Sequence, residues 1–299
     1  MKTGTNDTNL APPLSREEYC QVFRAYKSIS SEWTAMLGWI ENHLLKELAA
    51  RDHYSVLSVG CGGGDFDSEL ITALKRRCGF IDYVAVEPDL ACCEQFKTRI
   101  DSRGFDGFRY EVHSSSFETF FGETCGSQRP FDLIHFTHSL YYIEHRDQAL
   151  LSALDMLEED GRLLIFHQTE QGINQVQQRF LQRVTSGTDF MLSSRDLEFA
   201  LKRYLIPYRL EIIDSFLDIT GISSQASVEA HHLMNFFLES KVSALSADTI
   251  SEVFDYIQSI AFTDKGRRLI YHPVAILSIF KPKTSSIEPI AKLPVAIEP

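Results

Sequence analysis

The sequence is poor in basic residues and lacks long apolar runs. Its 299 residues include 29 Lys and Arg against 41 Asp and Glu, which gives a formal net charge of −12. Proteins that bind nucleic acid neutralise phosphates with an excess of basic side chains, so we expect no nucleic-acid partner. No segment is long and apolar enough to span a membrane, and the N-terminus lacks the apolar core of a signal peptide. The sequence therefore predicts a cytoplasmic protein with no membrane partner.

Cysteine pairs with metal-binding spacing are also missing. None of the six cysteines forms a C-x-x-C pair, so no metal site is expected. We interpret the adjacent Cys92 and Cys93 as small residues of a helix rather than as a redox pair, and all six cysteines as reduced thiols. Apolar residues make up 44% of the chain, which is enough to build a sizeable core. The length fits one large or two small domains, and we expect a monomer.

Three alternating glycines follow an apolar run and organise the rest of the chain. The continuous apolar pattern of residues 54–59 is typical of a buried parallel strand. Gly60, Gly62 and Gly64 permit a sharp turn and a close approach of a ligand to the backbone. Apolar residues at helical spacing over residues 66–77 then predict a helix. A strand, a glycine turn and a helix in this order are the usual start of a nucleotide-type cofactor site.

The pattern of the turn decides between cofactors. A dinucleotide fingerprint, G-x-G-x-x-G, requires glycine where this chain has Asp65, and a phosphate-binding P-loop requires a Lys that is absent. The remaining G-x-G-x-G pattern resembles motif I of the class I S-adenosylmethionine-dependent methyltransferases. Members of that family usually have an acidic residue where this chain has Ser58. Glu87 agrees with the family, because it ends a second strand-like run, residues 81–86, where the family has its ribose-binding carboxylate.

The resemblance implies S-adenosyl-L-methionine as cofactor and S-adenosyl-L-homocysteine as product. A carboxylate at Glu87 suits a ribose because it accepts hydrogen bonds from both hydroxyls. The polar residues 114–116 fall where the family often contacts the adenine end, and the Phe-Asp start of residues 131–137 resembles motif IV. The cofactor-binding residues implied by the resemblance are Gly60, Gly62, Gly64, Glu87, Ser115 and Thr137.

Strand patterns alternate with helical patterns along most of the chain, which indicates a parallel sheet wound on both faces. We therefore expect an α/β fold: a Rossmann-like seven-stranded, mostly parallel sheet with helices on both faces, an N-terminal helical lid and a helical insertion before the last strand. Strand patterns cover residues 54–59, 81–86, 108–113, 131–137, 162–167, 208–216 and 268–280. Helical patterns cover residues 66–77, 90–101, 146–157, 173–184, 194–204 and 229–260.

Composition sets the expected domain boundaries. Residues 1–13 are polar and end in Ala-Pro-Pro, which predicts a disordered tail, and residues 281–299 have no periodicity, which predicts a flexible tail. A single methyltransferase domain is expected over residues 14–280, and a capping box at Ser15 starts its first helix. Its expected parts are a helical lid at 14–53, a cofactor-binding core at 54–216, a helical substrate-side insertion at 217–266 and a last strand at 267–280.

Two further patterns resemble the histamine N-methyltransferase family. Tyr19, Phe23 and Tyr26 lie at helical spacing and are followed by Glu32, and a Leu-Tyr-Tyr sequence occupies residues 140–142. In that family the aromatic side chains and the glutamate line the amine pocket. The resemblance implies substrate-binding roles for Tyr19, Phe23, Glu32, His138, Tyr141, Tyr142, Phe236 and His272. It implies catalytic roles for Glu32, His138 and Tyr142.

Such a pocket suits a protonated amine. A cation that enters an apolar cleft loses hydration, which a carboxylate replaces, and aromatic ring faces add about 0.5–2 kcal/mol each when water is excluded. The acceptor half departs from the family, since His138 and His272 replace a glutamine and an asparagine, and residues 171–179 lack two tryptophans. Because imidazole takes a proton near neutral pH, His138 and His272 are candidate proton acceptors. His135, inside the fourth strand, is expected to be structural.

These patterns favour an S-adenosylmethionine-dependent N-methyltransferase of a small amine, imidazole or guanidine-type compound, histamine-like or a natural-product intermediate. Two alternatives remain open. An O-methyltransferase of a phenol or carboxylate would not need Glu32, although no acidic cluster for a divalent metal supports the catechol type. A catalytically silent cofactor-binding module would use the helical region after residue 216 to bind a protein.

Overall fold

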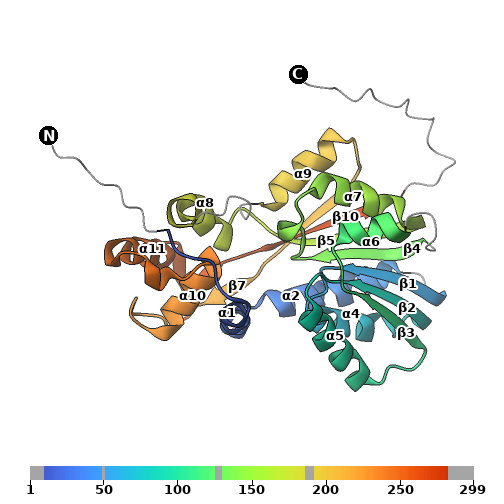
Figure 1. Cartoon of the computed structure of the whole chain (residues 1–299), viewed down its shortest axis with the longest axis horizontal. Coiled ribbons are helices and arrows are strands. Elements are labelled where there is room, and N and C mark those ends of the chain that lie inside the picture. Colours follow the sequence, from blue (N-terminus) through green and yellow to red (C-terminus); the bar gives the residue numbers. More distant parts are fainter. Residues whose placement is uncertain (1–9, 49–50, 125–129, 186–191, 282–299) are drawn as a thin grey trace.

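The computed structural model describes residues 10–48, 51–124, 130–185 and 192–281. Its central feature is a seven-stranded sheet with the order β3-β2-β1-β4-β5-β10-β6 (Figure 1). The strands are β1 (Arg51–Val59), β2 (Cys78–Val86), β3 (Phe108–His113), β4 (Phe131–Thr137), β5 (Leu157–Gln168), β6 (Arg209–Ile213) and β10 (Val274–Phe280). Neighbours from β3 to β5 are parallel, whereas β10 is antiparallel to β5 and β6. The expected Rossmann-like, mostly parallel sheet is confirmed.

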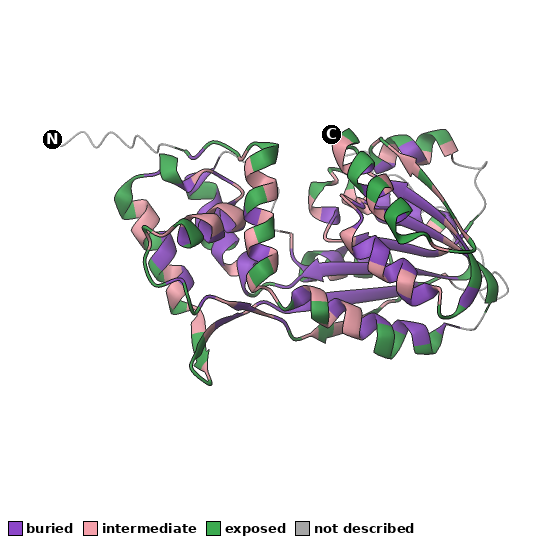
Figure 2. Ribbon diagram, turned by 90° about the horizontal axis from the view of Figure 1, so that it is seen from below, coloured by how far each residue is buried: buried purple, intermediate pink, exposed green. Residues whose placement is uncertain are grey.

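Helices cover both faces of this sheet (Figure 1). Val56 of β1 joins the apolar core on one face and the next residue, Leu57, joins the core on the other. Both side chains are fully buried, and Figure 2 shows such buried strands between helices with exposed outer sides. One face packs against α2 (Glu32–Trp39), the π-helical η1 (Ile40–Leu44), α4 (Asp65–Leu74) and α5 (Leu90–Arg103). The other packs against α6 (Phe117–Thr124), α7 (Arg146–Asp155) and α9 (Ser194–Arg203).

A second group of elements, here called the helical part, lies at one end of the sheet (Figure 1). Its core is separate from those of the sheet and includes the fully buried Phe180, Phe237 and Ile257. The helices are α1 (Arg16–Ile29), α8 (Ile173–Val184), α10 (Val228–Leu238), the 3-10 turn η3 (Val242–Ala244) and α11 (Ala247–Ser259). An antiparallel sheet of β7 (Phe216–Asp218), β9 (Arg267–Tyr271) and β8 (Ala261–Asp264) joins them.

Capping residues fix where the helices begin. The side chain of Ser15 accepts a hydrogen bond from the backbone N–H of Glu18, and the Glu18 side chain accepts one from the N–H of Ser15. This is the expected capping box at the start of α1, which is confirmed. Asp89 caps α5 and Ser246 caps α11 through their side-chain oxygens.

Part of the predicted disordered tail, residues 1–13, contacts the helical part. Ala11 lies in the core of the helical part and donates its N–H to the carbonyl of Val184 at 2.7 Å. The carbonyl of Pro12 accepts a hydrogen bond from the N–H of Lys241 at 2.9 Å. These are contacts with distant parts of the chain, which the composition of a short segment does not show. Residues 1–9 and 282–299, where most of the two tail predictions fall, lie outside the described residues.

The predicted last strand, residues 267–280, is two strands in different sheets. β9 belongs to the small sheet and β10 to the large one. Pro273 separates them, and it has no N–H to donate to a strand ladder. His272 therefore lies at a break between sheets rather than within a strand. The predicted strand over residues 208–216 is divided in the same way, into β6 and β7.

Several helix boundaries also differ from expectation. The helical stretch predicted for residues 229–260 is α10, η3 and α11, because Glu239 adopts φ +48° and ends α10. Within the expected helical lid, α2 starts at Glu32 and continues through η1 into α3 (Leu45–Glu47). After β4, the 3-10 turn η2 (Leu140–Tyr142) carries the Leu-Tyr-Tyr sequence. β5 starts at Leu157, five residues before the predicted start at Arg162.

Candidate functional site

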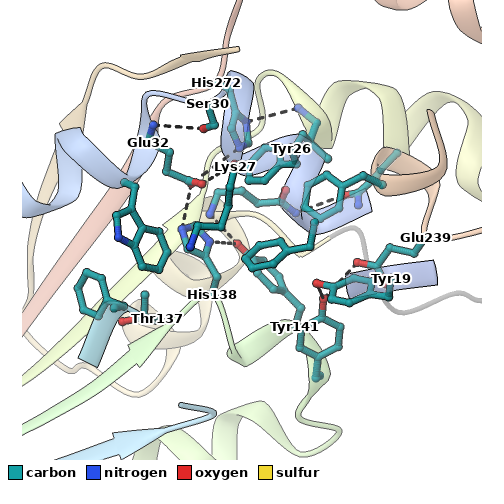
Figure 3. Close-up of a pocket in the computed structure, with 18 residues that line it drawn as sticks. Tyr19, Tyr26, Lys27, Ser30, Glu32, Thr137, His138, Tyr141, Glu239 and His272 are labelled. Carbon is teal, nitrogen blue, oxygen red and sulfur yellow. Dashed lines mark hydrogen bonds and ion pairs between the residues drawn. The ribbon is translucent and has the colours of Figure 1, made fainter. Parts of the chain in front are cut away.

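Two neighbouring cavities share a boundary between the helical part and the large sheet. The larger, here called the glycine-turn cavity, has a volume of about 940 Å³ and is bordered by the glycine turn and Glu87. The smaller, here called the aromatic cavity, has a volume of about 190 Å³ and is bordered by rings of α1 and α10 (Figure 3). Five residues border both cavities and define their junction: Tyr19, Phe23, His138, Tyr142 and Glu239. The two cavities can thus bring two ligands together.

The glycine turn borders the larger cavity closely because its glycines have no side chains. Gly60 has φ +73°, a left-handed conformation that favours glycine. A Cβ at Gly60 would lie 2.3 Å from the Cβ of Ser139, so a larger residue would displace the turn after β4. At Gly62, with φ +53°, no atom lies within 4 Å of the Cβ position. The space beside Gly62 is therefore open to a ligand.

Glu87 follows β2, and its carboxylate is fixed beside the glycine turn. Its Oε2 accepts a hydrogen bond from the N–H of Gly62 at 3.0 Å, and its Oε1 accepts one from the N–H of Asp89 at 2.9 Å. Carboxylate oxygens have further lone pairs, so Glu87 can still accept hydrogen bonds from a ligand. The carboxylate therefore both stabilises the turn and borders the cavity.

Three of the six predicted cofactor residues do not border the glycine-turn cavity. The adjacent Gly63 and Ser116 border it in place of Gly64 and Ser115. Gly64 instead forms the N-cap of α4 with φ +73°, and Ser116 precedes the first residue of α6 directly. Thr137, the last residue of β4, borders the aromatic cavity. The other three predicted residues, Gly60, Gly62 and Glu87, do border the glycine-turn cavity.

Aromatic rings form much of the wall of the smaller cavity. Tyr19, Phe23 and Tyr26 lie at helical spacing on α1, as predicted, and all three border the cavity. Phe236 of α10 packs against them, with ring centroids 4.2 Å from Tyr26 and 6.0 Å from Phe23. The stripe therefore has two roles, because Tyr26 is also buried in the core of the helical part.

Glu32 is a buried carboxylate in this aromatic wall. It is 5% exposed, and its Oε2 accepts a short hydrogen bond from the hydroxyl of Tyr26. Its Oε1 lies 3.0 Å from Nε2 of His138 and 3.9 Å from Nε2 of His272, although no hydrogen bond of suitable angle reaches it in the described part of the chain. Burial alone would raise the pKa of Glu32, but the two imidazoles and the Tyr26 hydroxyl outweigh burial and lower it to about 2. Glu32 is therefore ionised at neutral pH.

Both ring nitrogens of His138 face protein groups. Nδ1 lies 2.8 Å from the hydroxyl of Tyr141, which also accepts a hydrogen bond from the N–H of Gln168 at 2.9 Å. The other ring nitrogen is Nε2. That nitrogen points at Glu32. The backbone of His138, at φ +52°, places the ring in this position.

His272 is the second imidazole beside Glu32 and is buried. Its Nδ1 lies 3.5 Å from the N–H of Ile173 at the start of α8. The preceding residue, Gly172, has φ +67°, and a Cβ there would lie 2.6 Å from Nδ1 of His272. Burial lowers the pKa of His272, and the nearby carboxylate of Glu32 only partly opposes this effect.

Sequence reasoning missed Glu239, which borders both cavities from the end of α10. Its Oε1 accepts a hydrogen bond from the Tyr142 hydroxyl at 3.2 Å, and the Tyr142 hydroxyl lies 3.3 Å from that of Tyr19 (Figure 3). Burial raises the pKa of Glu239 to about 7, and the Tyr142 hydrogen bond partly offsets this rise. The available signal was its position, since Glu239 lies three residues after Phe236, where α10 ends.

Lys27 is the lysine that borders the aromatic cavity, and sequence reasoning also missed it. Its Nζ lies 3.1 Å from Oδ2 of Asp65 and 4.4 Å from the ring centroid of Trp33. Because Lys27 is paired with Asp65, it does not neutralise either carboxylate of the aromatic cavity.

Thr137 is connected to a buried polar network beneath the site. Its hydroxyl lies 3.1 Å from Nδ1 of His135, whose Nε2 lies 2.9 Å from the hydroxyl of Tyr83. Tyr83 in turn donates to Oδ1 of Asp67 at 2.7 Å. Burial lowers the pKa of His135 to about 3, so the ring is neutral and structural, as expected.

Within the described residues, no group of three or more His, Cys, Asp or Glu side chains is arranged to hold a metal ion. In the same ranges, no helix has the length and apolar character needed to cross a membrane.

A family model and individual relatives match this chain. The family model described as "Methyltransferase domain" matches residues 34–208. Histamine N-methyltransferase from Danio rerio is 26% identical over 235 residues, which cover 75% of this chain and 80% of that protein. Histamine N-methyltransferase A from Xenopus laevis is 28% identical over 170 residues, 53% of this chain and 58% of that protein. The crystal structure of the YcgJ protein from Bacillus subtilis has a similar fold, with a TM-score of 0.52, 13% identity and coverage of 83% of this chain and 98% of that one.

Proposed function

The chain belongs to the methyltransferase domain family, and we propose that it is an N-methyltransferase whose acceptor is a small amine, imidazole or guanidine-type compound. It is an S-adenosylmethionine-dependent enzyme, which leaves the acceptor as the open question. The observation that carries the proposal is a buried, ionised carboxylate, Glu32, in a small aromatic cavity that shares its boundary with the glycine-turn cavity.

The glycine-turn cavity fits the cofactor. Open space beside Gly62 leaves room for a ligand close to the backbone, and the cavity of about 940 Å³ is within the range of cofactor sites. Glu87 would accept hydrogen bonds from the two ribose hydroxyls, and Ser116 and Phe117 border the same cavity where the adenine end is expected. S-adenosylmethionine supplies a methyl group on a positively charged sulfur, which becomes neutral when the methyl group leaves.

The aromatic cavity fits a small cation. Its volume of about 190 Å³ is below the roughly 300–1,000 Å³ of drug-sized pockets, so the acceptor must be small. An ammonium, imidazolium or guanidinium group that leaves water needs a counter-charge, and Glu32 provides one. The faces of the neighbouring Tyr and Phe rings add cation–π attraction. Phenols and carboxylic acids, the alternative acceptors, carry no positive charge. They would therefore not need a buried carboxylate such as Glu32 as a counter-charge.

The protein residues contribute mainly alignment. Tyr19, Phe23 and Tyr142 border both cavities, so they would touch both reactants and exclude water between them. Holding two reactants in contact and in line is worth up to about 7–11 kcal/mol of the activation barrier. His138 and His272, on either side of Glu32, would orient its carboxylate toward the acceptor.

An acceptor screen tests the proposed function. The purified chain would be incubated with S-adenosylmethionine carrying a labelled methyl group and with separate pools of amines, imidazoles, guanidines, phenols and carboxylic acids. We expect label in one of the three nitrogen pools. Transfer confined to the phenol or carboxylic-acid pool would contradict the proposal in favour of an O-methyltransferase.

A further inference from the structure

We propose that Glu239 takes the proton that the acceptor nitrogen must lose, whereas Glu32 is the fixed counter-charge of the acceptor. This inference rests on the proposed function, since it concerns the reaction of that same site. It assigns different roles to the two carboxylates of the aromatic cavity. It also moves the role of proton acceptor away from His138 and His272, the two residues that the sequence favoured for it.

Protein groups lie beside both ring nitrogens of each imidazole. Nδ1 of His138 lies 2.8 Å from the Tyr141 hydroxyl, and Nε2 lies 3.0 Å from Oε1 of Glu32. His272 is 2% exposed, and its Nδ1 faces the N–H of Ile173. Its other nitrogen lies 3.9 Å from Oε1 of Glu32. A proton acceptor must reach the group that loses the proton, and both rings are oriented toward the protein instead.

Glu32 is also unsuited to take a proton. Its carboxylate has the Tyr26 hydroxyl on one oxygen and two imidazoles beside the other, all of which favour the ionised form. It borders only the aromatic cavity and not the junction with the glycine-turn cavity. A carboxylate so placed holds the end of the acceptor that is farther from the methyl donor.

Glu239 has the opposite surroundings at the place where the two reactants meet. It borders both cavities, and the Tyr142 hydroxyl is the hydrogen-bond partner of its carboxylate in the described part of the chain. The lysines on either side are occupied elsewhere, since Lys27 pairs with Asp65 and Lys241 pairs with Glu18. Figure 3 shows Glu239 and Glu32 at opposite sides of the group of lining residues.

The surroundings of the two carboxylates separate their pKa values. The imidazoles and the Tyr26 hydroxyl lower the pKa of Glu32 to about 2, and burial raises that of Glu239 to about 7. A proton acceptor works best when its pKa is near the working pH. Two carboxylates of one site whose pKa values are pushed apart commonly divide the roles of charge and proton transfer between them.

The reaction balances with these groups. The acceptor enters as a cation, and the ionised carboxylate of Glu239 removes one N–H proton, which leaves a lone pair on nitrogen and a neutral carboxyl. The nitrogen lone pair then forms the N–C bond as the C–S bond breaks. The electron pair of the C–S bond stays on sulfur. The methylated nitrogen carries the positive charge until the product leaves. The Glu239 proton is released to water afterwards.

The pH dependence of kcat tests this proposal. Wild-type kcat, measured with a nitrogen acceptor that the screen identifies, should rise with pH through an inflection near 7, because Glu239 must be ionised in the complex. Glu239→Gln should lower kcat at pH 8 by about a hundredfold and abolish the inflection.

Tyr142→Phe should move the inflection to higher pH, because the lost hydrogen bond had lowered the pKa of Glu239. The other titratable groups coupled electrically to Glu239 are Tyr19 and Tyr141, which remain neutral in this range.

Controls separate the proposal from structural effects. Glu229→Gln, an exposed change on the same helix, should leave the profile unchanged. The free energy of unfolding gives a readout without turnover. The free energy of unfolding of Glu239→Gln relative to that of wild type should grow from pH 5 to pH 8, because the wild type loses stability as a carboxyl with a raised pKa ionises in the folded state. The affinity for S-adenosylmethionine should not change.

Four results would overturn the proposal. Three concern Glu239→Gln: a wild-type pH profile, a loss of affinity for S-adenosylmethionine alone, or a raised acceptor KM with a normal kcat. The fourth is a wild-type chain that binds and methylates no acceptor. If the wild type methylates a phenol and no nitrogen compound, the proposed function fails. The role of Glu239 is then judged separately by the same profile on the phenol, which also loses a proton.

Discussion

Two carboxylates in one small cavity have opposite electrostatic environments, and single contacts decide the difference. Glu32 receives the Tyr26 hydroxyl and lies beside two imidazoles, which keep it charged. Glu239 is half-buried with the Tyr142 hydroxyl as its hydrogen-bond partner, and desolvation raises its pKa to about 7. Glu32 was predictable because it follows an aromatic stripe of a known pattern. Glu239 lies some 200 positions later in the chain, and only tertiary packing brings it to the same cavity.

Glu87 is the residue whose substitution tests the cofactor side. Replacing its carboxylate by an amide in Glu87→Gln removes one hydrogen-bond acceptor of the ribose and puts an N–H₂ beside the N–H of Gly62 or Asp89. We expect the Kd of S-adenosylmethionine, measured by calorimetry, to rise at least about tenfold, or 1.4 kcal/mol. Glu94→Gln, in an exposed pair with Lys97, is the control and should have no effect. An unchanged Kd for Glu87→Gln would refute the ribose assignment.

Among the elements, those with strong local patterns were predictable. The glycine turn, the capping box of α1 and the aromatic stripe are each set by neighbouring residues, so the sequence shows them. The break between β9 and β10 was not predicted, because strand-like apolar residues lie on both sides of Pro273 and the two halves differ in their partner strands. That break matters for the site, since it places His272 beside Glu32.

Gly172, at the start of α8, tests whether the break positions His272. In Gly172→Ala the new Cβ would meet Nδ1 of His272 at 2.6 Å and the residue would be strained at φ +67°. We expect kcat/KM for the acceptor to fall at least about tenfold, as misplacement near a site does, while the Kd of the cofactor changes little. Gly38→Ala is the control, because no atom lies within 4 Å of its Cβ position and alanine favours a helix. Equal kinetics of the two variants would show that His272 has no part in acceptor binding.

In the molecule as a whole, the sheet was predictable from the sequence. For the helical part, the sequence predicted the individual helices but not how they pack together. Buried parallel strands such as β1 are apolar throughout, which makes the α/β pattern visible without any tertiary information. The helical part builds its own core from segments that are far apart in sequence, from Ala11 to Ile270. Periodicity shows that α1, α8, α10 and α11 each have an apolar face, but not which faces meet. The junction of the two cavities depends on that packing.

Ala11 tests how the start of the described chain supports the helical part. It is 3% exposed and bonded to the end of α8, so Ala11→Asp would bury a charge without a partner. We expect a loss of more than about 2 kcal/mol in the free energy of unfolding, measured by chemical denaturation. Leu10→Asp, at a position 45% exposed, should cost little. Equal stability of the two variants would mean that this stretch does not hold the helical part together.

We propose Glu32 as the counter-charge of a cationic acceptor, and the steady-state kinetics of Glu32→Gln measure this role. Breaking one partner of a desolvated charge pair costs roughly 2–5 kcal/mol, so the KM for a nitrogen acceptor should rise about thirtyfold or more. The Kd of S-adenosylmethionine should stay the same, because Glu32 does not border the glycine-turn cavity. Glu41→Gln, an exposed change in the neighbouring η1, is the matched control. Wild-type acceptor kinetics in Glu32→Gln would contradict the account.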